Sequence, residues 1–313
     1  MLITVQLSMY IVLVNRPDRM GANLTWFIMQ IIYAHHYKYF IHCYDIVFSD
    51  SIFMKTIRQF TDNYNKKLGD ECGSHDHGPR LYWIKFNQQD WPGNCMIVCN
   101  AIQCDLVSYF KKHLYKEFRE ILDGFASETF KMDYDFVPSM KRTICVHLRL
   151  DDVTSRTDYD GRYSTEYYCE KLNKGNININ LQEEHLFGVS KNIHIPSWGR
   201  CYNPYDCQAP ISESRILTII DQAREKYPDH TVVVVASPVG EINLPYPCIR
   251  SDNTDQDLYY LCNVDVLICS RSLYCFSSVY LGNATEIYIP MWGHIAGTGL
   301  MTKFDESKLT YWF

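Results

Sequence analysis

The chain has 313 residues, of which 47% are hydrophobic and 21% are charged. This composition provides enough apolar side chains for a sizeable core, and it excludes a disordered chain. The 30 Lys and Arg residues are outnumbered by 36 Asp and Glu residues, giving a net charge of −6. General binding to nucleic acid or to anionic membranes is therefore not expected, and any anionic ligand must be held by a few local groups.

No segment has the pattern of a membrane span or a signal peptide. The uncharged stretch 1–15 is shorter than the ~20 residues that a spanning helix needs, and it lacks a basic start and a clear cleavage site. Residues 20–37 are also uncharged, but they include two His, one Gln and one Asn, which suit lipid poorly. We therefore expect a cytoplasmic protein whose 13 Cys residues are mostly reduced.

The first part of the chain predicts a strand, a turn and a helix. Residues 9–14 form a continuous apolar run, which is typical of a strand buried on both faces of a parallel sheet. A polar turn follows over 16–23, and we expect a helix over 24–40 with Asn23 as its N-cap. Residues 44–48 are the next expected strand.

Two further segments of the first half have clear composition. Residues 62–80 are polar and contain Gly, so we expect a loop there. Residues 103–124 have the apolar spacing of a second helical zone.

From residue 141 onward, short apolar runs alternate with helical patterns. The expected strands are 143–148, 231–236, 264–269 and 286–289, and the expected helices are 212–227 (capped by Ser212), 257–262 and 274–281. Such alternation is typical of βαβ units, so we predict an α/β fold with a doubly wound parallel sheet. A boundary near residue 138 would give two Rossmann-like domains, 1–138 and 139–313, with 173–210 as an insertion or lid.

Polar side chains follow the expected strands of the second half. They are Arg149, Asp151 and Asp152 after the first strand, Ser237 after the second, and Ser270, Arg271 and Ser272 after the third. The carboxyl ends of parallel strands meet at one edge, where ligands of such sheets bind. A Ser-rich turn that opens a helix can hold an anion, and an arginine beside it can hold a pyrophosphate through paired hydrogen bonds. The pattern predicts a nucleotide pocket that needs no metal.

Four short motifs occur in order along the chain. They are RMGANL at 19–24, HLRLDD at 147–152, STEYY at 164–168, and a block over 257–281 that contains a Ser-rich turn and a helix. Together they resemble the motifs of α1,2-fucosyltransferases and their α1,6- and protein O-fucosyltransferase relatives, over about two thirds of the chain. The segment at 147–152 is similar to the H-x-R-x-x-D-type motif of that group, and the segment at 19–24 to its G-N-x-L turn.

The resemblance implies a GT-B fold, with the acceptor on the first domain and the nucleotide sugar on the second. It implies inverting, metal-independent transfer of a sugar to a hydroxyl group of a glycan or glycoprotein, without a cofactor. GDP-fucose is the expected donor. A UDP-sugar such as UDP-xylose stays an alternative, because Leu150, Asp151 and Cys275 depart from the family pattern.

The expected site residues fall into three groups. The catalytic candidates are His147, Arg149, Asp151 and Asp152; the donor-binding candidates are Gly21, Asn23, Ser237, Asp257, Ser270, Ser272, Ser277 and Ser278; the acceptor-binding candidates are Tyr163 and Trp198. A departing nucleoside diphosphate gains negative charge, which Arg149 and backbone amides near Ser272 would stabilise in place of a metal. The acceptor hydroxyl must lose a proton, and Asp151 or Asp152 is the expected base. The choice between them stays open, because consecutive residues of an extended segment point to opposite sides.

Plainer interpretations stay open beside these. Arg149 can be a structural ion-pair partner, His147 a packed core histidine, and Ser270 and Ser272 simple helix caps. The whole chain can also be a catalytically silent module that binds a glycan or nucleotide. Metal sites are the least favoured alternatives: a zinc-type set of Cys72, His75, His77, Cys95, Cys99 and Cys104, and the D-x-D pairs Asp133/Asp135 and Asp158/Asp160.

Overall fold

The computed structural model describes residues 10–13, 15, 19–43, 46–72, 106–130, 140–150, 211, 213–238, 242–290 and 309–312. The chain divides into two compact units, residues 1–130 and residues 131–313. The expected boundary at residue 138 lies outside the described residues. The expected insertion over 173–210 lies outside them as well.

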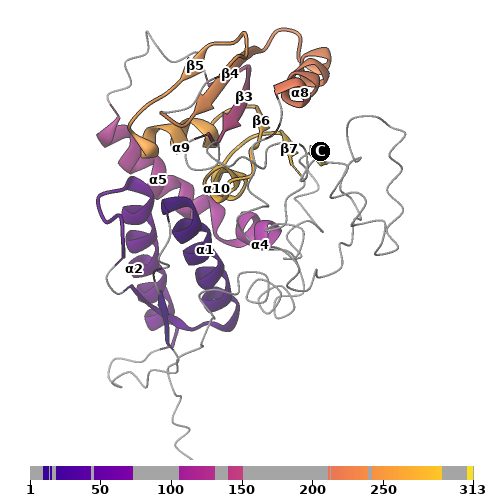
Figure 1. Cartoon of the computed structure of the whole chain (residues 1–313). Helices are drawn as coiled ribbons and strands as arrows, with labels where there is room; N and C mark the ends of the chain where they lie inside the picture. The colour runs from indigo at the N-terminus through magenta and orange to yellow at the C-terminus, as the bar shows by residue number, and fades with distance from the viewer. Residues whose placement is uncertain are drawn as a thin grey trace, which may run out of the picture. The chain divides into compact units, whose positions relative to one another are not determined.

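The first unit combines a short parallel sheet with helices (Figure 1). Its described elements are β1 (Tyr10–Leu13), α1 (Met20–Tyr37), β2 (Phe40–Cys43), α2 (Ile52–Cys72), α4 (Leu106–His113) and α5 (Tyr115–Thr129). Strand β1 pairs in parallel with β2, Tyr10 lying opposite Phe40. Every residue of α1 from Met20 to Ile32 is buried, as expected for a helix that is apolar on all sides.

Helix α1 begins earlier than the sequence predicted. Asn23 is not its N-cap, since Arg19 holds that position and Asn23 lies inside the first turn. The Asn23 side chain instead donates a hydrogen bond from Nδ2 to the Arg19 carbonyl oxygen at 3.3 Å. The apolar residues that follow Arg19 extend the helix by one turn beyond the expected start.

The strand expected at 44–48 is wrong, because β2 lies just before that segment. Helix α1 stops at Tyr37, where Lys38 takes a left-handed conformation with φ 54° and ψ 46°. Lys38 donates its backbone N–H to the last turn of α1, a common way for a helix to end. The chain therefore enters β2 several residues earlier than predicted.

The loop expected over 62–80 is wrong in its first part, because residues 62–72 belong to α2. The buried side chains of α2 recur at helical spacing and include Phe53, Ile57, Phe60 and Leu68. Asn65 also links α2 to the sheet: its Oδ1 accepts from the Ile41 N–H at 2.8 Å and its Nδ2 donates to the Ile41 carbonyl at 2.6 Å. The helical zone predicted over 103–124 is confirmed as α4 and α5.

The second unit is built on one parallel sheet. Its described elements are β3 (Thr143–Leu148), α8 (Glu213–Lys226), β4 (Thr231–Ala236), β5 (Cys248–Ile249), α9 (Thr254–Cys262), β6 (Val266–Ile268), α10 (Leu273–Leu281), β7 (Glu286–Ile289) and β8 (Leu309–Trp312). The strand order is β5-β4-β3-β6-β7-β8, and every neighbouring pair is parallel. This order is Rossmann-like, because the chain adds strands to one side of β3 and then moves to its other side at β6.

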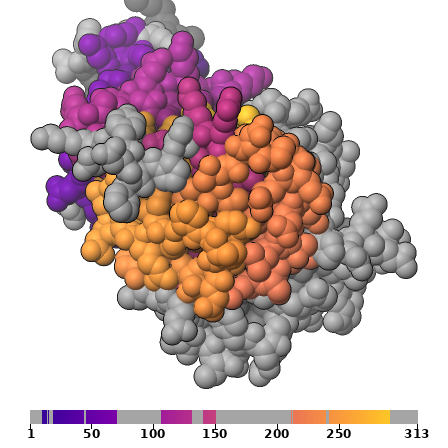
Figure 2. Space-filling view, turned by 90° about the horizontal axis from the view of Figure 1, so that it is seen from above, coloured from indigo at the N-terminus to yellow at the C-terminus, as the bar shows by residue number. Residues whose placement is uncertain are grey.

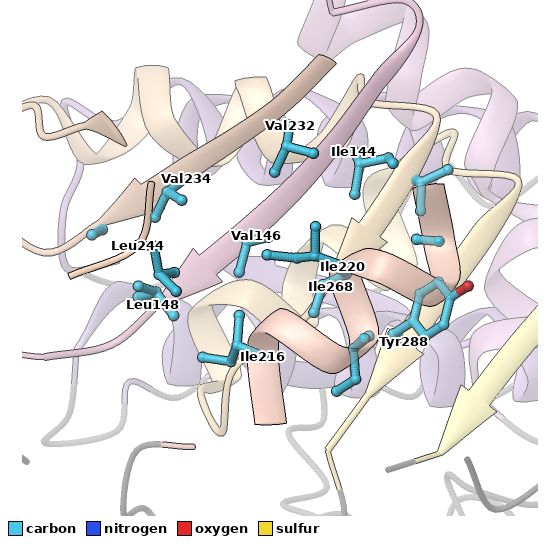
Figure 3. Packing of buried hydrophobic residues seen from close by; sticks show 14 of the residues in the cluster. Ile144, Val146, Leu148, Ile216, Ile220, Val232, Val234, Leu244, Ile268 and Tyr288 are labelled. Atoms are coloured by element: carbon cyan, nitrogen blue, oxygen red, sulfur yellow. The ribbon is translucent and has the colours of Figure 1, made fainter. Parts of the chain in front are cut away.

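Helices cover both faces of this sheet (Figure 1). Helix α8 lies on one face, where Ile216 and Ile220 pack against Val146, Val234 and other apolar side chains (Figure 3). Helices α9 and α10 lie on the other face. The strands read as continuous apolar runs because both of their faces are buried.

The α/β prediction with parallel sheets is confirmed. Strands β3, β4, β6 and β7 and helices α8, α9 and α10 all match predicted segments, although α9 begins at Thr254, before the expected start at Asp257. Strands β5 and β8 were not predicted.

Helices α8 and α9, with the described segments between them, form a continuous surface in shades of orange (Figure 2). Among the described helices, none is long and apolar enough to cross a membrane.

Candidate functional site

The candidate site lies at the carboxyl edge of the second unit's sheet, between β3 and β6. The strand order reverses between these two strands, and in open parallel sheets such a reversal point opens a crevice for ligands. Strand β3 ends at Leu148 and leads to Arg149, which is half-buried. Strand β6 ends at Ile268 and leads to Ser270, Arg271 and Ser272, all of which are buried.

His147 and Ser270 form the central contact of the site. His147 Nδ1 lies 2.6 Å from Ser270 Oγ, although the two residues are 123 positions apart in the chain. Both are buried, with 7% of each residue exposed. An imidazole nitrogen can donate or accept a hydrogen bond. If Nδ1 donates to Ser270 Oγ, the bond orients the ring; if Nδ1 accepts, it binds the proton of the Ser270 hydroxyl.

Cys275 completes this contact from helix α10. Burial raises the pKa of the Cys275 thiol. The hydrogen bond with Cys269, the charge and hydrogen bond of His147, and the Ser270 backbone outweigh burial, so the pKa is lowered overall. The thiol also lies in the first turn of α10, where helix N–H groups favour a negative charge. The pKa of the neighbouring Cys269 is raised, first by burial and then by Cys275.

Asp257 joins the cluster from helix α9. Its Oδ1 accepts a hydrogen bond from Ser251 Oγ at 2.9 Å. Burial raises the pKa of Asp257 to about 6, while the Ser251 hydrogen bond and the His147 charge partly oppose the rise. The centroids of the Tyr274 and His147 rings lie 5.6 Å apart. The Tyr274 hydroxyl donates a hydrogen bond to the Thr254 carbonyl oxygen.

Two predicted serines organise the backbone at this edge. Ser272 is the N-cap of α10, and its Oγ accepts from the Tyr274 N–H at 3.3 Å. Ser237 joins the ends of β3 and β4: its Oγ accepts from the Leu150 N–H at 3.2 Å, and its own N–H donates to the Leu148 carbonyl at 3.3 Å. Both residues fix the loops that surround His147.

Two other predicted serines lie deeper in α10. Ser277 Oγ donates to the Leu273 carbonyl at 2.8 Å, and Ser278 Oγ donates to the Cys275 carbonyl. Both side chains are buried. The structure thus assigns these hydroxyls a contact within their own helix, and their donor-binding role remains a prediction.

The remaining predicted residues belong to the first unit or lie outside the described residues. Gly21 and Asn23 belong to the first unit, buried within α1. Asp151, Asp152, Tyr163 and Trp198 lie outside the described residues. The side chains of the zinc-type set and of both D-x-D pairs also fall outside them. In the described part of the chain, no three His, Cys, Asp or Glu side chains form a group suited to a metal ion.

Sequence reasoning missed the contributions of Tyr274, Cys275 and Ser251. Cys275 had one usable signal, its place three residues after Ser272, because the first turn of a helix favours a thiolate. The Ser251 contact had none, since it depends on how the loop before α9 folds back on the helix.

The cluster as a whole combines groups that can hold and transfer protons. Four polar side chains of different types are buried together: His147, Ser270, Asp257 and Cys275. Buried titratable groups that shift one another's pKa in this way are typical of functional sites.

No protein family model, curated protein or solved structure matches this chain.

Proposed function

We propose that the chain is a nucleotide-sugar-dependent glycosyltransferase whose second unit binds the donor at the carboxyl edge between β3 and β6. The observation that supports this most directly is the strand order, with its reversal beside His147 and Ser270. At such a point the loops on either side diverge and leave room for a nucleotide. The four motifs at 19–24, 147–152, 164–168 and 257–281 favour the fucosyltransferase-like group.

In the proposed reaction, an acceptor hydroxyl attacks the anomeric carbon of the donor sugar, and the nucleoside diphosphate leaves with inversion. The half-buried Arg149 would stabilise the departing diphosphate, together with backbone N–H groups at the start of α10. His147 is held by Ser270 at 2.6 Å and so can keep a fixed orientation during a proton transfer. Asp151 and Asp152 remain the candidate bases.

The GT-B arrangement of the two units and the identity of the donor belong to the same proposal. GDP-fucose is the favoured donor and a UDP-sugar such as UDP-xylose the alternative. The acceptor would be a hydroxyl of a glycan or glycoprotein.

A thermal-shift panel with GDP, UDP and their sugars tests donor binding. A ligand that binds only the folded protein stabilises it by about 2.7 kcal/mol at 100 times its Kd. We expect GDP and GDP-fucose to raise the melting temperature more than UDP does. Stabilisation by UDP and UDP-xylose alone would move the proposal to a xylosyl donor.

Release of nucleoside diphosphate from the same donors tests the activity. We expect slow release by the wild type without acceptor, loss of this release in Arg149→Ala, and no effect of EDTA. Nucleotide binding without release or transfer for any donor would favour the silent binding module. Loss of activity with EDTA would favour a metal-dependent transferase instead, and no response to any nucleotide would end the proposal.

A further inference from the structure

We propose that Arg271 is a second cationic ligand for the donor, so that Arg149 and Arg271 together form a diphosphate site between β3 and β6. This inference rests on the proposed function for the source of the diphosphate, and it adds a residue that the motif at 147–152 does not contain. The probe can be inorganic pyrophosphate, so the site can be tested without any nucleotide sugar.

The two arginines follow neighbouring strands of the sheet. Val146 of β3 pairs with Ile268 of β6 in the parallel ladder. Arg149 lies three residues beyond Val146, and Arg271 lies three residues beyond Ile268. Both arginines therefore follow neighbouring strands by three residues, at the edge where the strand order reverses.

Arg149 lies on the same side of its strand as His147. Leu148 and Leu150 both belong to the apolar cluster that packs against α8. Because side chains alternate along an extended segment, Arg149 between them is directed toward the other face, on which His147 meets Ser270. The first arginine therefore emerges beside the loop that contains the second.

The backbone around Arg271 is fixed on both sides. Ser270 contacts His147 through its hydroxyl, and Ser272 caps α10 while its N–H donates to the Ser270 carbonyl at 2.8 Å. Arg271 itself is only 5% exposed. A guanidinium stays charged in proteins, and Arg271 already has an interaction within the protein that helps to hold its side chain in place. A positioned and buried arginine is better suited to a specific anion than a mobile one on the surface.

A pair of arginines favours a diphosphate over a single phosphate. Each guanidinium can donate two parallel hydrogen bonds to one phosphate group. Two such groups can therefore bind the two phosphates of a nucleoside diphosphate, whereas a monophosphate engages only one of them. We expect the site to prefer pyrophosphate over phosphate, and GDP or UDP over GMP or UMP.

Isothermal titration of the full chain with inorganic pyrophosphate tests this. We expect Arg271→Gln to weaken pyrophosphate binding roughly tenfold or more, which is about 1.4 kcal/mol. Arg271→Lys should restore part of the affinity, because the charge returns without the paired hydrogen bonds. Arg250→Gln is the matched control: Arg250 also follows a strand of this sheet, the edge strand β5, but is exposed and contacts the Pro238 carbonyl. It should leave pyrophosphate binding unchanged.

Circular dichroism of each variant separates loss of binding from loss of folding. If Arg271→Gln does not fold, Arg271→Lys decides, and we expect it to bind pyrophosphate less tightly than the wild type. Wild-type affinity in a folded Arg271 variant would overturn the inference, as would a wild type that does not bind pyrophosphate at millimolar concentration. Pyrophosphate binding without turnover of any nucleotide sugar would reject the proposed function and leave this inference standing. If the Arg271 variants turn over nucleotide sugar as fast as the wild type, the proposed function stands and this inference is rejected.

Discussion

Asp257 is a single carboxyl group whose environment makes it sensitive to pH near neutrality. It is only 8% exposed, and burial raises its pKa to about 6 from an ordinary value of 3.8. Between these two values the folded protein binds the proton more tightly than the unfolded chain does. Asp257 therefore favours folding at low pH, and its contribution is lost as the pH rises through about 6.

We predict that Asp257→Asn removes this pH dependence. Asn keeps an oxygen that can accept from Ser251 Oγ, but it has no charge to bury. As the pH rises from 4 to 7, the unfolding free energy of the variant should increase relative to that of the wild type by up to about 3 kcal/mol. Above pH 7 the difference between the two proteins should stay constant. Urea unfolding at several pH values measures this difference.

Asp221→Asn is the control for this prediction, because Asp221 is an exposed residue of α8. The difference in unfolding free energy between Asp221→Asn and the wild type should not change with pH in the way expected for Asp257→Asn. A flat difference for Asp257→Asn between pH 4 and pH 7 would show that the carboxyl group is not buried as described.

At the scale of elements, Gly282 marks a close approach of two helices. It is the C-cap of α10, and its N–H donates to the Ser278 carbonyl at 2.7 Å. A Cβ atom at this position would lie 2.3 Å from that carbonyl oxygen and 3.2 Å from the Cys262 Cα at the end of α9. The neighbouring atoms are backbone, so they cannot move aside as a flexible side chain would.

We predict that Gly282→Ala destabilises the protein by about 2–3 kcal/mol, because α9 or α10 must shift to admit the methyl group. Gly124→Ala in α5 should do the opposite. Gly124 is exposed within the helix and has no atom within 4 Å of the added Cβ, so the change should stabilise by roughly 0.5–1 kcal/mol. Chemical unfolding of both variants measures the contrast, and equal effects of the two would contradict the packing at Gly282.

The elements that the sequence revealed are those whose own residues specify them. The run Thr231–Ala236 is apolar after its first residue, so it is recognised as a buried strand without knowledge of its neighbours. Helix α2 was missed because its polar, Gly-containing end resembles a loop, although Phe60 and Leu68 are buried in it. Strand β5 has two residues and forms mainly because β4 lies beside it, so no local pattern identifies it.

At the scale of the whole molecule, the candidate site was only partly predictable. The sequence places His147 at one strand end and Ser270 at another, but their contact depends on β3 and β6 being neighbours. His147 and Ser270 are separated by 123 positions in the sequence. The role of Cys275 depends on the same adjacency, since its lowered pKa comes partly from His147. A list of strands does not fix their order, so these contacts could not be derived before the topology was known.

The two edges of the second unit's sheet differ in their buried polar groups. The candidate site lies at the carboxyl edge, whereas Glu286 begins β7 at the amino edge and is fully buried. Its carboxylate accepts from Lys226 Nζ and Tyr227 Oη, each at 3.0 Å, and from the Tyr288 hydroxyl. These contacts attach the end of α8 to the sheet, so we assign Glu286 to stability and not to ligand binding.

We therefore predict that Glu286→Gln costs about 3 kcal/mol of stability while the folded variant binds nucleotide with the wild-type Kd. The amide removes the charge that Lys226 approaches, and its NH2 group cannot accept from a tyrosine hydroxyl, so a buried donor loses its partner. Lys226→Met should cost less than Glu286→Gln, because the Lys226 side chain is 40% exposed and both tyrosine hydroxyls still donate to Glu286. Urea unfolding measures the first effect and titration with GDP the second. A weakened Kd in folded Glu286→Gln would show that the two edges of the sheet are coupled, because a change confined to the amino edge would then reach His147 and Arg149.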